Sequence, residues 1–164
     1  MRATLALAVV LWSLGLTHAM ACPAANEPGE APAGLARPMP RDIGTGFGMQ
    51  LHPLLGVRKQ HTGVDFVGPI GEPVLAVAAG VVIEALYKSQ NGNFVAIRHR
   101  GGLSTTYSHL SRITVKAGDC LERGQVIGHV GSTGLVAEPH LHFEVLKDGV
   151  FVDPAPLLLP IPGR

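Results

Sequence analysis

Short apolar runs separated by turn residues fill most of the chain after residue 70. Asn91-Gly92 lies between two such runs, where Asn-Gly is a strong hairpin signal. Gly101-Gly102 reverses the chain again, and no stretch has the spacing of a long helix. The segments expected as strands are residues 74–79, 81–87, 94–99, 103–110, 125–130, 140–146 and 150–152. The pattern predicts an all-β fold, a compact antiparallel sheet domain that is curled or sandwiched.

The first 21 residues have the pattern of an export signal. Arg2 precedes an apolar run over residues 5–16, and Ala19-Met20-Ala21 supplies the small residues of a cleavage site. An apolar run of about a dozen residues is short for a membrane span, which needs about 20. We therefore expect residues 1–21 to be a signal peptide cleaved after Ala21, with a retained N-terminal anchor as the alternative.

The next segment, residues 22–41, is rich in proline and has little apolar periodicity. This composition is typical of a flexible leader. Cys22 leaves two alternatives open, because it could carry a lipid or pair with Cys120 in an exported, disulfide-permissive compartment. The compact domain is expected over residues 42–160, followed by a tail at 161–164.

Composition narrows the class of protein. The chain has 46% hydrophobic and 15% charged residues, which excludes an intrinsically disordered chain. Its 21 glycines and 13 prolines favour short strands and turns over a helical bundle. A net charge of +1 gives no electrostatic basis for binding nucleic acid. Two cysteines are too few for a tetrathiolate zinc site.

A carrier module is one alternative that the sequence raises. Residues 71–77 and 116–128 share a Gly-acid turn that leads into a Val-rich strand, as in lipoyl and biotinyl carriers. A carrier needs a lysine at an exposed hairpin tip, but the comparable turns contain Gly80 and residues 131–134, which have no lysine. The carrier function is therefore ranked below the hydrolytic ones.

Histidines point to a metal site. His61 and Asp65 are separated by three residues, and Gly63 between them is expected to let the backbone turn so that both side chains face one point. Imidazole nitrogen and carboxylate oxygen are both ligands that zinc accepts. By strand alternation, His140 and His142 share one face of their strand. His109 is expected to share a face with Tyr107 on the segment 103–110.

Together these motifs resemble the lysostaphin/LytM-type zinc peptidases, which cut peptide bridges of bacterial cell walls. The resemblance covers about residues 44–156 and implies the duplicated hybrid motif fold, which is barrel-sandwich-like. The motifs that carry it are His61-x-x-x-Asp65, Tyr107-x-His109-Leu110, His140-Leu141-His142, Gly46-Phe47-Gly48 with His52-Pro53, Ala79-Gly80-Val81-Val82, Gly131-Ser132-Thr133-Gly134 and Asp153-Pro154.

The resemblance implies that His61, Asp65 and His142 bind Zn²⁺, and that His109 and His140 are unligated catalytic residues. Three protein ligands leave a fourth position open, as in catalytic zinc sites. Zinc activates water for attack on a peptide bond, and the two free histidines could exchange protons with the reactants. Their individual roles stay open.

The implied function is a zinc metallo-endopeptidase that hydrolyses peptide crosslinks of peptidoglycan. The bond is either a D-amino-acid crosslink or a glycine bridge. A non-catalytic regulator of cell-wall hydrolases, using the same groove, is the alternative. We further expect a monomer, located in the periplasm or cell envelope, without a membrane span after signal cleavage.

The other histidines receive different predictions. His99 ends an apolar strand and is expected to pack or to lie at the rim of the site, whereas His52 shapes a loop and His129 lies on the surface. Relatives commonly carry Arg where this chain has Gln50. This departure concerns substrate preference rather than metal binding.

Overall fold

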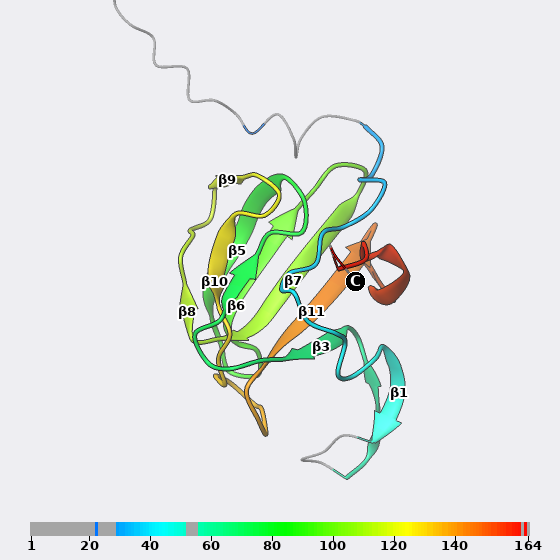
Figure 1. Cartoon of the computed structure of the whole chain (residues 1–164), viewed down its shortest axis with the longest axis vertical. Helices are drawn as coiled ribbons and strands as arrows, with labels where there is room; N and C mark the ends of the chain where they lie inside the picture. Colours follow the sequence, from blue (N-terminus) through cyan, green and yellow to red (C-terminus); the bar gives the residue numbers. More distant parts are fainter. Residues whose placement is uncertain (1–21, 23–28, 52–55, 162, 164) are drawn as a thin grey trace, which may run out of the picture.

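The chain folds almost entirely into β-strands (Figure 1). The computed structural model describes Cys22 and residues 29–51, 56–161 and 163. The strands are β1 (Gly48–Leu51), β2 (Arg58–His61), β3 (Val64–Val67), β4 (Pro73–Leu75), β5 (Gly80–Lys88), β6 (Gly92–Arg98), β7 (Leu103–Leu110), β8 (Arg112–Ile113), β9 (Cys120–Leu121), β10 (Val126–His129), β11 (His140–Lys147) and β12 (Val150–Val152). One 3-10 helix, η1 (Ala155–Leu157), follows them, and within the described residues no helix is long and apolar enough to cross a membrane.

Three antiparallel sheets make up the domain. The largest has the order β12-β11-β7-β6-β5-β9, and β3 pairs with the first half of β11 while β12 pairs with its second half. A second sheet has the order β4-β10-β8, and the hairpin β1-β2 forms the third. This hairpin projects from the body of the domain next to β3 (Figure 1). The all-β antiparallel prediction is confirmed.

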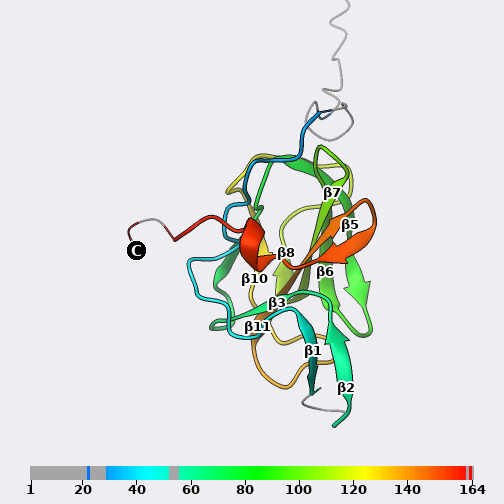
Figure 2. The same ribbon diagram turned by 90° about the vertical axis from the view of Figure 1, so that its right-hand side faces the viewer.

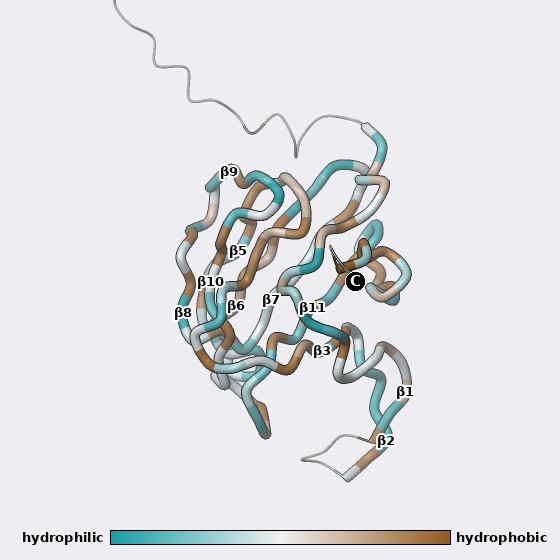
Figure 3. The backbone as a smooth tube through the Cα atoms, viewed as in Figure 1, coloured by the Kyte–Doolittle hydropathy of each residue, from teal (hydrophilic) through white to brown (hydrophobic). Residues whose placement is uncertain are grey.

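The core lies between the large sheet and the β4-β10-β8 sheet. Ile127 of β10 and Ile97 of β6 are fully buried in the same cluster, together with Phe66 and Phe143. Burying each such side chain stabilises the fold by roughly 1.5–3 kcal/mol. Along β11 hydrophobic and hydrophilic residues alternate (Figure 3), so one face enters this core and the other is left for polar chemistry.

The sequence located the strands of the large sheet well and missed the shortest ones. The segments expected at 81–87, 94–99, 103–110, 140–146 and 150–152 all match observed strands to within a few residues. The segment 74–79 is a strand only as far as Leu75. Strands β1, β2, β3, β8 and β9 were not predicted. Their two to four residues are too few for a periodic signal.

The prediction of a flexible leader over residues 22–41 fails for its second half. Leu35 and Met39 are completely buried in the core. The backbone of Leu35 accepts a hydrogen bond from Leu159 and donates one to Leu157. Figure 2 shows the same ribbon from the side. An extended segment can bury two apolar side chains in the core without any periodic pattern, so composition alone did not predict this packing.

Cys22 and Cys120 form a disulfide in this structure. The bond joins the chain ahead of the packed segment to β9, across a sequence separation of 98 residues. Of the two alternatives that the sequence left open for Cys22, pairing with Cys120 is the one observed. The signal peptide expected at 1–21 lies outside the described residues.

Candidate metal centre and active site

Strands β3 and β11 bring the first two candidate ligands together. Asp65 and His142 are register partners, and side chains directly opposite each other in an antiparallel pair share one face. The flanking residues Leu141 and Phe143 are fully buried on the opposite face. The expected alternation along β11 is therefore confirmed, and it turns His140 and His142 toward the same side of the sheet.

Gly63 brings its segment close to β11, for a reason different from the one expected. Its φ angle does not fall in the left-handed region, so no special turn requires glycine here. A Cβ atom at this position would instead collide with the backbone oxygen of Phe143 and lie 2.9 Å from Cγ of Glu144. Glycine is needed because the two backbones approach closely.

Three donor atoms converge at the end of β3. Nε2 of His61 lies 3.0 Å from Nδ1 of His142, and Oδ1 of Asp65 lies 3.2 Å from the first and 2.8 Å from the second. Zinc–ligand distances of about 2.0–2.1 Å in a tetrahedral site place neighbouring donors about 3.3 Å apart. The triangle fits a tetrahedral zinc site to within a few tenths of an ångström, and its three protein donors leave the fourth position open.

Backbone carbonyls fix which ring nitrogen is available. Nδ1 of His61 lies 2.7 Å from the carbonyl oxygen of Gly46. A carbonyl only accepts hydrogen bonds, so Nδ1 carries the proton and Nε2 keeps its lone pair for a metal. The motif Gly46-Phe47-Gly48 thus helps to orient this ligand.

His109 and His140 lie beside the three donors. Their ring centroids are 4.9 Å apart, and the His109 ring lies 6.0 Å from that of His142. Nδ1 of His109 is 2.8 Å from the carbonyl oxygen of Thr133, and Nδ1 of His140 is 2.8 Å from that of Glu138. Both rings therefore carry their proton on Nδ1 and keep the lone pair on Nε2, and Nε2 of His140 lies 3.8 Å from Oδ1 of Asp65.

His109 reaches this position through an irregularity in β7. Its φ angle is +65°, and the pairing of β6 with β7 shifts register between Asn93 and Val95. The expectation that His109 shares a face with Tyr107 is therefore wrong. Tyr107 is completely buried, and its hydroxyl accepts a hydrogen bond from the backbone N–H of Val77.

The electrostatics of the donor cluster favour a cation. Burial raises the pKa of Asp65, but hydrogen bonds and attraction from His142 and His61 outweigh it and hold that pKa well below its usual range. Burial lowers the pKa of His142, yet hydrogen bonds to Asp65 and Glu144 raise it to about 9. The metal-free cluster thus stabilises a positive charge on His142, at the place where a divalent ion would lie.

The pKa of His109 shifts in the opposite direction to that of His142. Burial lowers its pKa to about 4, and the hydrogen bond to Thr133 opposes this shift only in part. Its ring is therefore neutral near pH 7. A neutral imidazole with a free Nε2 can act as a proton acceptor.

Two supporting groups were missed by the sequence reading. Glu144 is 8% exposed and contacts Nε2 of His142 at 3.2 Å. It lies two residues after His142 on the same strand face, so alternation could have identified it. Thr133 holds His109 through a backbone oxygen, which side-chain identity does not reveal.

The remaining histidines differ in their surroundings. His99 is buried and lies within 2.8 Å of both the carbonyl oxygen of Ala79 and Oγ1 of Thr105, so it packs in the fold, as one of its two predicted roles required. His129 is only partly buried and contacts Arg112. His52 lies outside the described residues.

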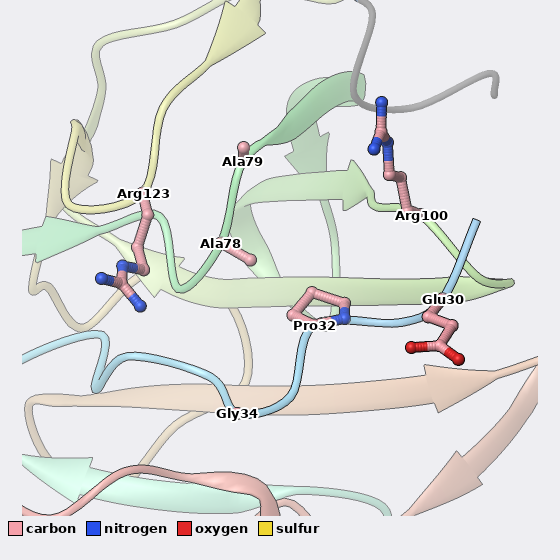
Figure 4. Close-up of a pocket in the computed structure, with 7 residues that line it drawn as sticks. All are labelled: Glu30, Pro32, Gly34, Ala78, Ala79, Arg100 and Arg123. Atoms are coloured by element: carbon pink, nitrogen blue, oxygen red, sulfur yellow. The ribbon is translucent and has the colours of Figure 1, made fainter.

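A cavity with no metal-binding cluster lies elsewhere in the domain (Figure 4). It is lined by Ala78, Ala79, Arg100 and Arg123, among others, and the two arginine side chains point in different directions. Gly101-Gly102, next to Arg100, lies at the end of β7 opposite to His109. This cavity is therefore separate from the histidine cluster.

Comparison with known proteins agrees with this geometry. The model of peptidase family M23 matches residues 59–154, which include all five candidate site residues. The chain belongs to peptidase family M23. The resemblance to the lysostaphin/LytM-type peptidases is thereby confirmed.

Proteins similar to this chain include named peptidases. The chain is 45% identical over 111 residues to the peptidoglycan DD-endopeptidase ShyC of Vibrio cholerae, covering 68% of this chain and 26% of that protein. A zinc-containing peptidase from Vibrio cholerae superposes with a TM-score of 0.66 at 37% identity, covering 85% of this chain and 41% of the other. The catalytic domain of lysostaphin from Staphylococcus simulans gives 0.64 at 36% identity, covering 71% and 90%. The donor triangle and this M23 membership identify Zn²⁺ as the cofactor.

Proposed function

We propose that this domain is a zinc-dependent endopeptidase that cleaves peptide crosslinks of bacterial peptidoglycan. The observation that carries the proposal is the triangle formed by Nε2 of His61, Oδ1 of Asp65 and Nδ1 of His142, with edges of 2.8–3.2 Å. These three residues would hold the metal. His109 and His140, which keep the lone pair on Nε2, lie at the edge of the same cluster, with Nε2 of His140 3.8 Å from Oδ1 of Asp65.

A bound zinc ion supplies Lewis acidity, which lowers the pKa of water and polarises a carbonyl group. The protein's own contribution is to place proton carriers beside the reacting atoms. We assign His109 as the base, because its ring is neutral and its Nε2 is unprotonated. We assign His140 as the group that, once protonated on Nε2, stabilises the oxyanion and returns a proton to the leaving amine.

For the substrate, we propose a D-amino-acid crosslink rather than a glycine bridge. The support is that a relative 45% identical over 111 residues is named a peptidoglycan DD-endopeptidase. The matched region is 26% of that protein, so substrate choice is argued from the shared domain alone. All five site residues come from one chain, which supports action as a monomer.

We also propose that the chain is exported and acts in the periplasm or cell envelope. The disulfide between Cys22 and Cys120 supports this, because disulfides persist in oxidising compartments. The same sulfur atom of Cys22 cannot carry a thioether-linked lipid while it is in this disulfide. The proposed location is therefore reached without a lipid anchor at Cys22.

Digestion of purified peptidoglycan tests the function. The zinc-loaded protein is expected to release crosslink-cleaved fragments that mass spectrometry identifies, and chelation or Asp65→Asn is expected to abolish their release. Defined muropeptides with either crosslink type would identify the bond. A protein that binds one zinc per chain yet cleaves neither would contradict the enzyme and favour the regulator of cell-wall hydrolases.

A further inference from the structure

Glu144 is a buried carboxylate without a role in the proposed hydrolysis. It lies on β11 opposite Thr106 of β7 and is 8% exposed. A buried charge is costly unless hydrogen bonds compensate for the lost water. The buried carboxylate of Glu144 therefore needs hydrogen-bond donors close to its two oxygens.

Three groups satisfy this carboxylate. The hydroxyl of Thr62 donates to Oε1 at 2.6 Å, and that of Thr106 donates to Oε2 at 2.6 Å. Nε2 of His142 lies 3.2 Å from Oε1. The two threonines, from opposite sides, fix the carboxylate plane and direct Oε1 toward the histidine.

The two ring nitrogens of His142 consequently face different groups. Nδ1 lies 2.8 Å from Oδ1 of Asp65 and 3.0 Å from Nε2 of His61, whereas Nε2 faces Glu144. A nitrogen that binds a metal must keep its lone pair, so in a loaded site the proton belongs on Nε2. A carboxylate is the acceptor that best retains a proton there.

We propose that Glu144 is a positioning residue for the metal centre, which holds His142 in the Nε2–H form with Nδ1 directed at the metal. This inference rests on the proposed function, because it requires a metal held by His61, Asp65 and His142. Glu144 contacts neither the metal nor the substrate. It acts through His142, and Thr62 and Thr106 act through Glu144.

Gly63 lies close to β11 and leaves room for the side chain of Glu144. A Cβ atom on Gly63 would lie 2.9 Å from Cγ of Glu144. Glycine therefore leaves the space in which the carboxylate lies between β3 and β7. Thr62, the residue before it, then reaches Oε1.

Zinc affinity of the full chain tests the proposal. Dissociation constants would be measured by competition with a chromogenic chelator for wild type, Glu144→Leu, Glu144→Gln and the control Glu72→Gln. Glu144→Leu removes the acceptor and is expected to weaken zinc binding by about 10–100-fold. Glu144→Gln keeps an acceptor oxygen and is expected to lose less. Glu72 pairs with Arg41 outside the cluster, so its variant should match wild type.

A second readout separates positioning from simple stability. In zinc-loaded, ¹⁵N-labelled wild type, the NMR signals of His142 should show a protonated Nε2 whose hydrogen exchanges slowly. In the zinc-loaded variant Glu144→Gln this exchange should be faster. If Glu144→Leu does not fold, Thr106→Val, which frees one carboxylate oxygen, should also weaken zinc binding and speed the exchange.

The outcomes distinguish the two proposals. Equal zinc affinity and equal Nε2 exchange in wild type and the folded Glu144 variants would overturn the role of Glu144 and leave the zinc site intact. Wild type that binds no zinc would overturn the proposed function and this inference together. Weaker binding with faster exchange in Glu144→Gln, but not in Glu72→Gln, would support the inference.

Discussion

Each histidine of the site depends on a hydrogen-bond acceptor at the ring nitrogen that faces away from the reaction. Backbone carbonyls fill this role for His61, His109 and His140, and a carboxylate, Glu144, fills it for His142. The resemblance to the lysostaphin/LytM-type peptidases, which these motifs carry, implied the five site residues, and the structure brings their side chains together. The sequence could not show which ring nitrogen of each histidine keeps its lone pair. Every residue has a backbone carbonyl, so the acceptor is decided only by which residue the fold places next to the ring.

His109 belongs to the site but is not one of its three metal-ligand candidates, so its loss should affect catalysis and not zinc binding. We expect His109→Ala to retain zinc, because His109 is not one of the three converging donors. Removing a proton carrier should lower kcat by about 10²–10⁴-fold. Peptide release and zinc content would be measured on the same preparation. His129→Ala, a partly buried histidine beside Arg112, is the control and should keep full activity. Loss of zinc in His109→Ala would contradict the assignment.

At the scale of elements, the irregular end of β7 is the feature that sequence reasoning misjudged. Strict alternation placed His109 beside Tyr107, but a register shift and a positive φ turn it toward the site. The loop that contains Thr133 makes this possible. Oγ1 of Thr133 donates to Leu110 at 2.8 Å and accepts from the N–H of Asn93 at 3.0 Å. Such a contact between distant segments has no local signature.

A substitution at Gly92 tests whether the loop that contains Thr133 positions His109. The φ of Gly92 is +65°, and a Cβ atom there would collide with Thr133. We expect Gly92→Ala to reduce the free energy of unfolding by about 1–3 kcal/mol and to lower kcat by on the order of 10²-fold through displacement of His109. Gly118 also has a positive φ, of +91°, but nothing lies within 4 Å of its Cβ position. Gly118→Ala should lose stability without loss of kcat, and an equal loss of kcat in both variants would contradict the argument.

His99 links the entry of β5 to β7 and makes stability depend on pH. Burial lowers its pKa, although the hydrogen bond to Ala79 opposes the shift. Below about pH 6.5 the unfolded chain therefore binds a proton that the folded chain does not, and stability falls as pH decreases. The nearby Tyr107 stays neutral, because burial raises its pKa to about 12.

Urea unfolding of the chelator-treated protein at pH 7.5 and 5.5 would measure this effect. Wild type should lose more free energy of unfolding between these values than His99→Gln does, by at most about 1.4 kcal/mol per pH unit. Because both proteins contain the same metal-site histidines, the difference isolates His99. Parallel curves for the two proteins would contradict a neutral, buried His99.

In the whole molecule, the segment before residue 42 packs against the rest of the domain. Its prolines predicted a flexible leader, yet Leu35 and Met39 complete the core. Composition describes the average behaviour of a segment, whereas burial depends on individual side chains such as Leu35 and Met39. By contrast, the long strands of the large sheet followed directly from alternation and turn residues, because their signals repeat over seven to nine residues.

A substitution at Leu35 measures how much this segment contributes to the free energy of unfolding. Leu35→Ala removes a fully buried side chain and is expected to reduce the free energy of unfolding by about 2–5 kcal/mol. Leu157→Ala, at a position 38% exposed, is the matched control and should cost much less. Chemical denaturation of both variants would measure the difference. A loss in Leu35→Ala as small as the one expected for the control would show that the segment near Leu35 contributes little to the stability of the fold.

The central claim is that three side chains hold one zinc ion and leave two histidines free. Anomalous diffraction from crystals of the zinc-loaded protein, measured at the zinc absorption edge, tests it most directly. We expect one peak at about 2.0–2.2 Å from Nε2 of His61, Oδ1 of Asp65 and Nδ1 of His142. His109 and His140 should lie beyond ligand distance. A peak bound by either of these two histidines, or no peak between the three donors, would contradict the account.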